Sequence, residues 1–344
     1  MFIASLLFTF LFFVNNTSAR NDASKDNRSM VGFSFYRPNK QDRTATVVNS
    51  GPNELNKWCP PAIRRDLQPH CLCNGPYVFP VISCQQLNNE REVRRMKTIK
   101  FPITNIGKFR FNDSIVTRFD TFNMPIKMAI QFIEIEKTRI TEIDLKAFDA
   151  SSDTLVRLTV VHSNLSKFPF SYLKNFKRLQ YLDLFYNQLT QIHDFAFGSN
   201  SILTHIDLSF NSISYIGSYA FYDLPNLKHL DLRFNKIKVL NNNAFTSRFP
   251  KYDLNDGLSL DISHNKMFFI ADDAFSRTTF KKIDISHNVL KKFGYTQFEP
   301  IIRTMITVGK GMIQVEGKHS ANLTNLANTN KTIHSNKLHK NYIT

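Results

Sequence analysis

A pattern that recurs every 24 residues constrains the fold of this chain more than any other feature. It has the form L-x-x-L-x-L-x-x-N-x-L, with a phenylalanine eight residues after its last leucine. The clearest copy consists of Leu179, Leu182, Leu184, Asn187, Leu189 and Phe197, and the next two copies are centred on Asn211 and Asn235. A fixed period of this length predicts a solenoid, in which each coil buries its apolar residues by stacking on its neighbours.

The residue types in one copy predict the course of one coil. Leu182 and Leu184 alternate with Asp183, which is typical of a strand with alternate side chains in the core. Asn187 follows where the chain must turn, and its amide can bond backbone groups at both ends, so that stacked coils form a buried ladder. Phe197 then lies on the opposite side of the coil and closes it from behind.

Less regular copies flank the three clear ones. Ser114, Thr138 and Ser163 occupy the asparagine position in three earlier copies, where a hydroxyl can serve the same turn more weakly. Two later copies contain Asn265 and Asn288, and the first of them follows six inserted residues around 248–256. We therefore expect about eight coils within 101–315, and a ragged ninth built from Ile306, Val308, Gly311 and Ile313.

The chain outside the repeats divides into four segments. Residues 1–19 contain a short apolar run that ends near small residues, which predicts a cleaved signal peptide and a secreted protein. Residues 20–57 form a polar arm and residues 316–344 a basic tail, both expected to be disordered. Residues 58–100 contain all four cysteines, Cys59, Cys71, Cys73 and Cys84.

The four cysteines predict two disulfides. An even number in one short segment behind a signal peptide is typical of an oxidising compartment, and three pairings are possible. Zinc is the weaker alternative because the segment has no C-x-x-C pair.

These repeats and the C-P…C-x-C…C order resemble the extracellular leucine-rich repeat family. The resemblance implies an α/β solenoid shaped as a horseshoe, with a concave parallel β-sheet, a mostly irregular convex side and an N-terminal cysteine cap. It also implies the pairing Cys59–Cys73 and Cys71–Cys84. Family members often end in a second cysteine cap, but no cysteine follows Cys84; either the tail or a partner covers the last coil, or the chain is an incomplete gene product.

The net charge of +16 does not indicate nucleic-acid binding, because of where the charge lies. Residues 101–300 carry 24 Lys and Arg against 20 Asp and Glu, so the excess is in the arm, the cap and the tail. Basic extremities on a secreted protein favour acidic glycans or other acidic surfaces as contacts. No second apolar stretch predicts a membrane span.

The concave face of the three clear coils is the predicted binding surface. An aspartate stands four residues before each asparagine, which predicts an exposed acidic stripe with internal repulsion. Aromatic residues stand immediately before the asparagines and resemble an interface hot spot, although packing at the strand edge is equally compatible with them. The candidate contacts are Tyr181, Asp183, Phe185, Tyr186, His205, Asp207, Phe210, His229, Asp231, Arg233 and Phe234.

No motif predicts catalysis, a cofactor or a metal site. The chain lacks G-x-S-x-G, P-loop and H-E-x-x-H patterns, and His205 and His229 have no well-spaced third ligand. Sequons predict glycans at Asn27, Asn112, Asn164, Asn322 and Asn330 where these are exposed.

The functional expectation is a secreted, non-enzymatic protein that binds an extracellular protein or glycoprotein. The W-C-P-P start of the cap and the phenylalanine-rich early coils resemble secreted arthropod members of the family. That likeness implies a second hypothesis, a non-catalytic companion subunit of a secreted enzyme of the luciferase or monooxygenase type. An extracellular matrix or adhesion module is the third.

Overall fold

The computed structural model describes residues 71–75, 79–87, 91, 105–120, 128–198, 200–247, 257–290, 297–298 and 312–314. The predicted signal peptide, arm, tail and 248–256 insertion lie outside the described residues, as does Cys59.

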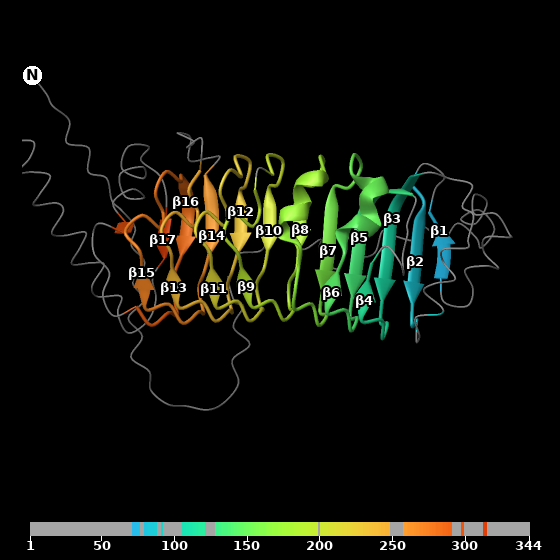
Figure 1. Ribbon diagram of the computed structural model, residues 1–344, viewed down its shortest axis with the longest axis horizontal. Coiled ribbons are helices and arrows are strands. Elements are labelled where there is room, and N and C mark those ends of the chain that lie inside the picture. The colour runs from blue at the N-terminus through green and yellow to red at the C-terminus, as the bar shows by residue number, and fades with distance from the viewer. Residues whose placement is uncertain are drawn as a thin grey trace, which may run out of the picture.

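One long sheet runs the length of the described chain (Figure 1). Its eleven strands stand in chain order along the long axis, and every neighbouring pair is parallel except the first. The fold class is therefore confirmed as a solenoid with a parallel sheet. The strands are β1 (Cys71–Asn74), β2 (Val81–Gln85), β3 (Asn105–Asn112), β5 (Ala129–Glu136), β7 (Arg157–Val161), β8 (Tyr181–Asp183), β10 (His205–Asp207), β12 (His229–Asp231), β14 (Leu258–Asp261), β16 (Phe280–Asp284) and β17 (Met312–Gln314).

The register of the sheet follows the repeat. Leu182 of β8 pairs with Ile206 of β10, which pairs with Leu230 of β12. Equivalent residues therefore lie side by side, and the six-residue insertion before β14 leaves this register intact, since Leu230 pairs with Leu260. The inward residues are fully or almost fully buried from β1 to β16.

A file of phenylalanines closes the coils from behind, as the sequence predicts. Phe197, Phe221 and Phe245 stack with ring centroids 5.1 and 5.4 Å apart, and Phe275 continues the file at 5.9 Å. Each of these rings is 3% exposed or less. Their stacking fills the space between successive coils, which no single coil could enclose.

The predicted asparagine ladder is present. The amide nitrogen of Asn211 donates to the carbonyls of Leu184 and Leu208 at 3.0 and 3.1 Å. Its oxygen accepts from the backbone N–H of Leu189 at 3.0 Å. Asn187, Asn235, Asn265 and Asn288 bond in the same way. Each amide thus joins its own turn to the preceding coil.

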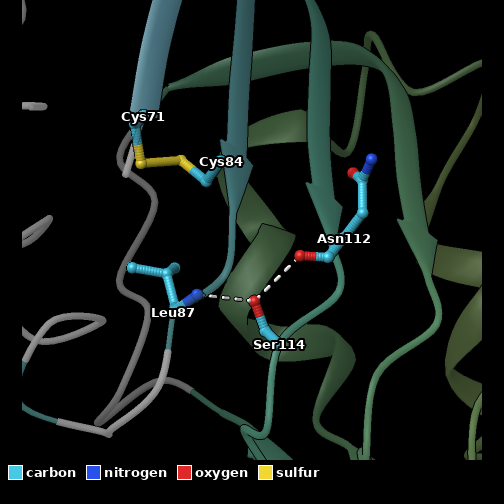
Figure 2. The surroundings of a disulfide bond; sticks show 5 residues. All are labelled: Cys71, Cys84, Leu87, Asn112 and Ser114. Atoms are coloured by element: carbon cyan, nitrogen blue, oxygen red, sulfur yellow. Dashed lines mark hydrogen bonds between the residues drawn. A yellow bond between two sulfur atoms is a disulfide. The ribbon is translucent and has the colours of Figure 1, made fainter. Parts of the chain in front are cut away.

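Hydroxyls replace the amides in the early coils. Figure 2 shows that Ser114 accepts from the N–H of Leu87 at 3.2 Å and donates to the carbonyl of Asn112 at 3.0 Å. Ser163 likewise accepts from the N–H of Thr138 at 3.1 Å. A hydroxyl makes fewer bonds to the turn than an amide does, in line with the sequence-based expectation.

A disulfide lies at the N-terminal end of the sheet. Cys71 of β1 and Cys84 of β2 are antiparallel partners and are bonded to each other (Figure 2). This confirms one of the two predicted pairings. Cys73 is also disulfide-bonded, and the Cys59–Cys73 pairing stays a prediction because Cys59 lies outside the described residues.

The other sides of the coils are mostly irregular. Three short two-stranded sheets lie away from the main sheet, and two 3₁₀ helices precede β7 and β8 (Figure 1). These elements are β4 (Arg118–Phe119) with β6 (Glu142–Ile143), β9 (Gln191–Ile192) with β11 (Tyr215–Ile216), β13 (Val239–Leu240) with β15 (Phe269–Ile270), η2 (Leu145–Ser151) and η3 (Phe170–Asn175). Among the described residues, none of the helices has the length and apolarity that crossing a membrane requires.

The predicted register of the ninth coil is wrong. The sequence pattern aligns Ile306 with Ile283, whereas the structure pairs Ile313 with Ile283. β17 therefore begins at Met312, later than expected. No asparagine anchors the repeat there, so the apolar spacing alone left the register open.

Candidate partner-binding surface

The outward side chains of β7 to β16 form one surface, here called the sheet face. Its rows run across the strands, because residues at equivalent repeat positions pair in register. Three rows are described in turn: a column at the start of the strands, an aspartate row, and an aromatic column at the turn.

The first row, here called the donor column, consists of Arg157, Tyr181, His205 and His229. They lie on β7, β8, β10 and β12 and pair in register. The guanidinium carbon of Arg157 lies 4.5 Å from the centroid of the Tyr181 ring. The Tyr181–His205 and His205–His229 ring centroids are each 4.6 Å apart and nearly parallel. All four are half-buried.

Both histidines in the donor column are held neutral. Burial lowers the pKa of His205 to about 4, with the charges of His229, Arg157 and Lys228 adding to the effect. Burial, followed by Lys281 and Lys228, also lowers the pKa of His229. At pH 7 the fixed positive charge of the donor column is therefore that of Arg157.

The aspartate row differs from the predicted exposed stripe. Asp183 and Asp207 are half-buried, but Asp231 is 0% exposed, Asp261 2% and Asp284 6%. Each carboxylate accepts from the backbone N–H two residues later, as Asp207 does from Ser209 at 2.9 Å. The exposed acidic stripe is therefore a wrong prediction, because these side chains fold back onto their own turns.

The predicted internal repulsion of the aspartate row is present. Burial raises the pKa of Asp231 well above its usual range, and the neighbouring Asp207 adds to this rise. Burial likewise raises the pKa of Asp261. Arg233 opposes the repulsion, since its Nε lies 3.0 Å from a carboxylate oxygen of Asp231.

The third row, here called the ring column, consists of the residue before each ladder position from β7 to β16. Centroid distances along it are 5.1, 6.3, 4.3, 4.2 and 4.1 Å, and the last four contacts are stacked. Tyr186 is 54% exposed, whereas Phe210 and Phe234 are half-buried rather than core residues. The members are His162, Tyr186, Phe210, Phe234, His264 and His287.

The backbone of the ring column is left-handed. φ lies between 50° and 55° at all six residues. Such a conformation suits glycine or asparagine, and with a bulky side chain it costs roughly 1–2 kcal/mol per residue. The same position is left-handed in the earlier coils, where it is occupied by Gln86, Asp113 and Lys137. The turn therefore requires this conformation but does not require an aromatic ring.

The structure brings the candidate residues onto the sheet face. Tyr181, His205 and His229 belong to the donor column, and Tyr186, Phe210 and Phe234 to the ring column. Phe185 packs edge-on against Phe210 at 5.2 Å, between the two columns. The remaining candidates, Asp183, Asp207, Asp231 and Arg233, belong to the aspartate row or are bonded to it.

Sequence reasoning missed two features of this surface. Arg157 stands six residues before Ser163, the same offset at which Tyr181 precedes Asn187, so the repeat itself places it in the donor column. His162 extends the ring column at its N-terminal end, and its position before the ladder residue Ser163 is the signal that could have added it. His264 and His287 continue the same row in the sequence but were not among the candidate contacts.

The first coils carry a charge cluster in which two cations share one carboxylate. Lys108 and Arg110 of β3 contact Glu134 of β5 at 2.8 and 3.0 Å. Burial raises the pKa of Glu134, but Lys108 and Arg110 together lower it below its usual value.

One hollow on the surface of the described residues is too small for an organic ligand. A hollow lined by Phe221, Leu224 and Phe245, among others, has a volume of ≈ 40 Å³, room for roughly one water molecule. No group of three His, Cys, Asp or Glu among the described residues could hold a metal ion.

Two of the five sequons are described. Asn164 is exposed, whereas Asn112, at the end of β3, is half-buried and its Oδ1 is buried without a hydrogen bond among the described residues. Glycosylation at either site stays a prediction, and Asn27, Asn322 and Asn330 lie outside the described residues.

Comparison with known proteins agrees with this geometry. The family model described as "Leucine rich repeat" matches residues 153–213 and 201–247. The fold is a leucine-rich repeat solenoid. No curated protein matches the chain.

Two solved structures resemble it. A crystal structure of a TLR13–ssRNA13 complex matches with 23% identity and a TM-score of 0.48, over 62% of this chain and 29% of that chain. A crystal structure of an LRIM1/APL1C complex matches with 17% identity and a TM-score of 0.43, over 67% of this chain and 38% of that chain. The matched region thus spans well under half of either neighbour, and neither likeness extends to what those complexes bind.

Proposed function

We propose that this chain is a secreted, non-catalytic binding protein that recognises an extracellular protein or glycoprotein through its sheet face. The contacts come from the coils of Asn187, Asn211 and Asn235, where the donor column and the ring column flank the aspartate row. The disulfide between Cys71 and Cys84 supports an oxidising compartment, since such bonds are rare in the cytosol.

The ring column is the observation that carries this proposal. Tyr186, Phe210 and Phe234 keep rings outside the core, at a backbone position where asparagine or glycine would be less strained. Stacking recovers roughly 0.5–1.5 kcal/mol per pair, so the rings offset their own strain at best. Rows of aromatic side chains at a protein surface are typical of interface hot spots. The ring column thus favours a macromolecular partner over a purely structural role.

Under the companion-subunit hypothesis, the partner of the sheet face is a secreted enzyme. It rests on the sequence resemblance to the non-catalytic subunit of Oplophorus-luciferin 2-monooxygenase. Recovery of a stoichiometric enzyme on the sheet face would favour it, whereas recovery of matrix proteins would favour an adhesion module.

Partner capture tests the proposal. The purified full-length chain is immobilised and exposed to the secreted fluid of its source, and retained proteins are identified by mass spectrometry. We expect wild type to retain a specific partner and the Phe210→Ser/Phe234→Ser variant to lose at least about 90% of it, because ring contacts dominate interface energies.

The matched control is Phe268→Ser, which removes a ring that is 51% exposed on the side of the short strands. Thermal melts confirm that all variants are folded. If the ring variant retains the partner as well as the control does, the ring column is not the binding surface.

A further inference from the structure

The donor column contains an unsatisfied cationic group. Among the described residues, the buried Nε atom of Arg157 has no hydrogen-bond partner, and the guanidinium lies over the face of Tyr181. A buried N–H without an acceptor costs roughly 1–3 kcal/mol. An arginine presents its N–H groups in a fixed fork that matches a carboxylate. No carboxylate among the described residues pairs with Arg157, so the half-buried guanidinium can take an anion from a partner.

The stacked imidazoles continue the donor column beside Arg157. His205 and His229 are half-buried, 4.6 Å apart, and in register with Tyr181. Charge on either ring is disfavoured by burial and by the surrounding cations. An anion that lies across the column would remove this repulsion and favour the protonated rings.

Charged residues lie on the strands that pack beside His205 and His229. The strand before the pair contributes Asp183, the strands of the pair contribute Asp207 and Asp231, and the later strands contribute Asp261, Lys281, Lys282 and Asp284, while Lys228 lies immediately before β12. The carboxylates of the row are tied to their own turns, and the pKa of Asp231 and of Asp261 is raised by burial. The aspartates outnumber the lysines, but the fixed charges that lower the pKa of His205 and His229 are those of Arg157, Lys228 and Lys281, which are all positive.

We propose that the donor column binds the carboxylates of an acidic polypeptide segment, and that this binding is coupled to protonation of His205 and His229. The inference rests on the proposed function, because it assigns a chemical class to the partner of the same surface.

The ring arrangement favours a polypeptide over a sulfated glycan. In both columns the ring faces are turned toward neighbouring rings, with centroids 4.1–6.3 Å apart. The rings of His162 and Tyr186 are tilted relative to each other, and the other pairs are stacked. Sugars stack their C–H groups on open ring faces, and these are taken. The outward ring edges carry positive charge density, which attracts carbonyl and carboxylate oxygens.

Proton linkage fixes the direction of the pH dependence. In the unbound protein, His205 and His229 are neutral at pH 7 because their pKa is lowered. A bound carboxylate raises that pKa. The complex therefore holds more protons than the free protein, so affinity rises as pH falls. The partner keeps its charge above about pH 5, since glutamate has a pKa near 4.3.

Calorimetric titration of the full-length chain with an acetylated deca-glutamate peptide tests the inference. We expect binding about tenfold tighter at pH 5.5 than at pH 7.5, which corresponds to a net uptake of about half a proton. Titration in two buffers of different ionisation enthalpy measures that uptake directly. Deca-glutamine is the uncharged peptide control.

Three variants locate the effect. His205→Gln/His229→Gln should abolish most of the pH dependence, and Arg157→Gln should weaken binding about tenfold at pH 7.5. His193→Gln changes an exposed histidine elsewhere and should behave as wild type. Because the tail histidines His319, His334 and His339 also titrate, the decisive quantity is the difference between wild type and the double variant.

The outcomes separate this inference from the proposed function. A double variant with the same proton uptake as wild type overturns the inference, and so does an Arg157→Gln variant with unchanged affinity. The inference is also overturned, in favour of a sulfated glycan, if a heparin-derived hexasaccharide binds more tightly than deca-glutamate and the Arg157 and histidine variants weaken that binding. If the double variant fails to fold, the affinity of Arg157→Gln still decides. Partner capture that depends on Phe210 and Phe234 would stand in each of these cases.

Discussion

At the scale of single residues, the sheet face shows that a repeated side chain need not be an exposed one. Each aspartate of the row accepts from a backbone N–H two residues away, and this short-range bond turns the carboxylate away from a partner. Asp231 is the extreme case, because it lies between Asp207 and Asp261 and is fully buried. Its carboxylate contributes to the turn at the expense of charge repulsion.

This predicts a pH-dependent effect of Asp231→Asn. The pKa of Asp231 is raised in the folded state, so the folded protein binds the proton more readily than the unfolded chain does. The wild type therefore gains stability from this group as pH falls and loses it as pH rises. Relative to wild type, the variant should gain roughly 1 kcal/mol in free energy of unfolding between pH 5 and pH 8.

Urea denaturation at several pH values measures this difference. Asp153→Asn is the control, since Asp153 is exposed and its pair with Lys177 contributes little. Parallel pH profiles for Asp231→Asn and wild type would show that the buried carboxylate carries no strain.

At the scale of the coil, the phenylalanine file and the asparagine ladder make different contributions. Phe221 is 3% exposed and is stacked between Phe197 and Phe245, so Phe221→Ala should cost roughly 3–5 kcal/mol by opening a cavity. Asn211→Ala leaves the N–H of Leu189 without its acceptor, whereas the carbonyl of Leu184 keeps the Asn187 amide as a donor, so the change should cost on the order of 1–3 kcal/mol.

Thermal unfolding of both variants tests this assignment, with Phe268→Ala as the control for an exposed ring. An unchanged midpoint for Phe221→Ala would mean that the stacked file does not hold the coils together.

The repeat explains why so much of the coil was predictable. Leu182, Asn187 and Phe197 recur at a fixed spacing, and stacking in register converts that spacing directly into strand pairs. The register of the ninth coil was missed because it has no ladder asparagine. The fate of the aspartate side chains was missed because a bond between neighbouring turn residues leaves no trace in the periodicity.

At the scale of the whole molecule, the sheet face carries two columns of different side-chain chemistry, and the strand register fixes their positions. The register places the donor column on the strands and the ring column at the turns that follow them, so one partner could contact both columns. The sequence located this surface because equivalent positions of adjacent coils become neighbours. It could not show the stacking of Tyr181, His205 and His229 or the unpaired Nε of Arg157, which depend on side-chain conformation.

Hydroxyl-radical footprinting of the captured complex shows whether the partner lies on the sheet face. We expect Tyr181, Tyr186, Phe210 and Phe234 to become protected from oxidation on binding. Tyr215 and Phe268, which are exposed on the side of the short strands, should be oxidised as in the unbound protein. Protection of Tyr215 and Phe268 with no change at Phe210 and Phe234 would contradict this expectation.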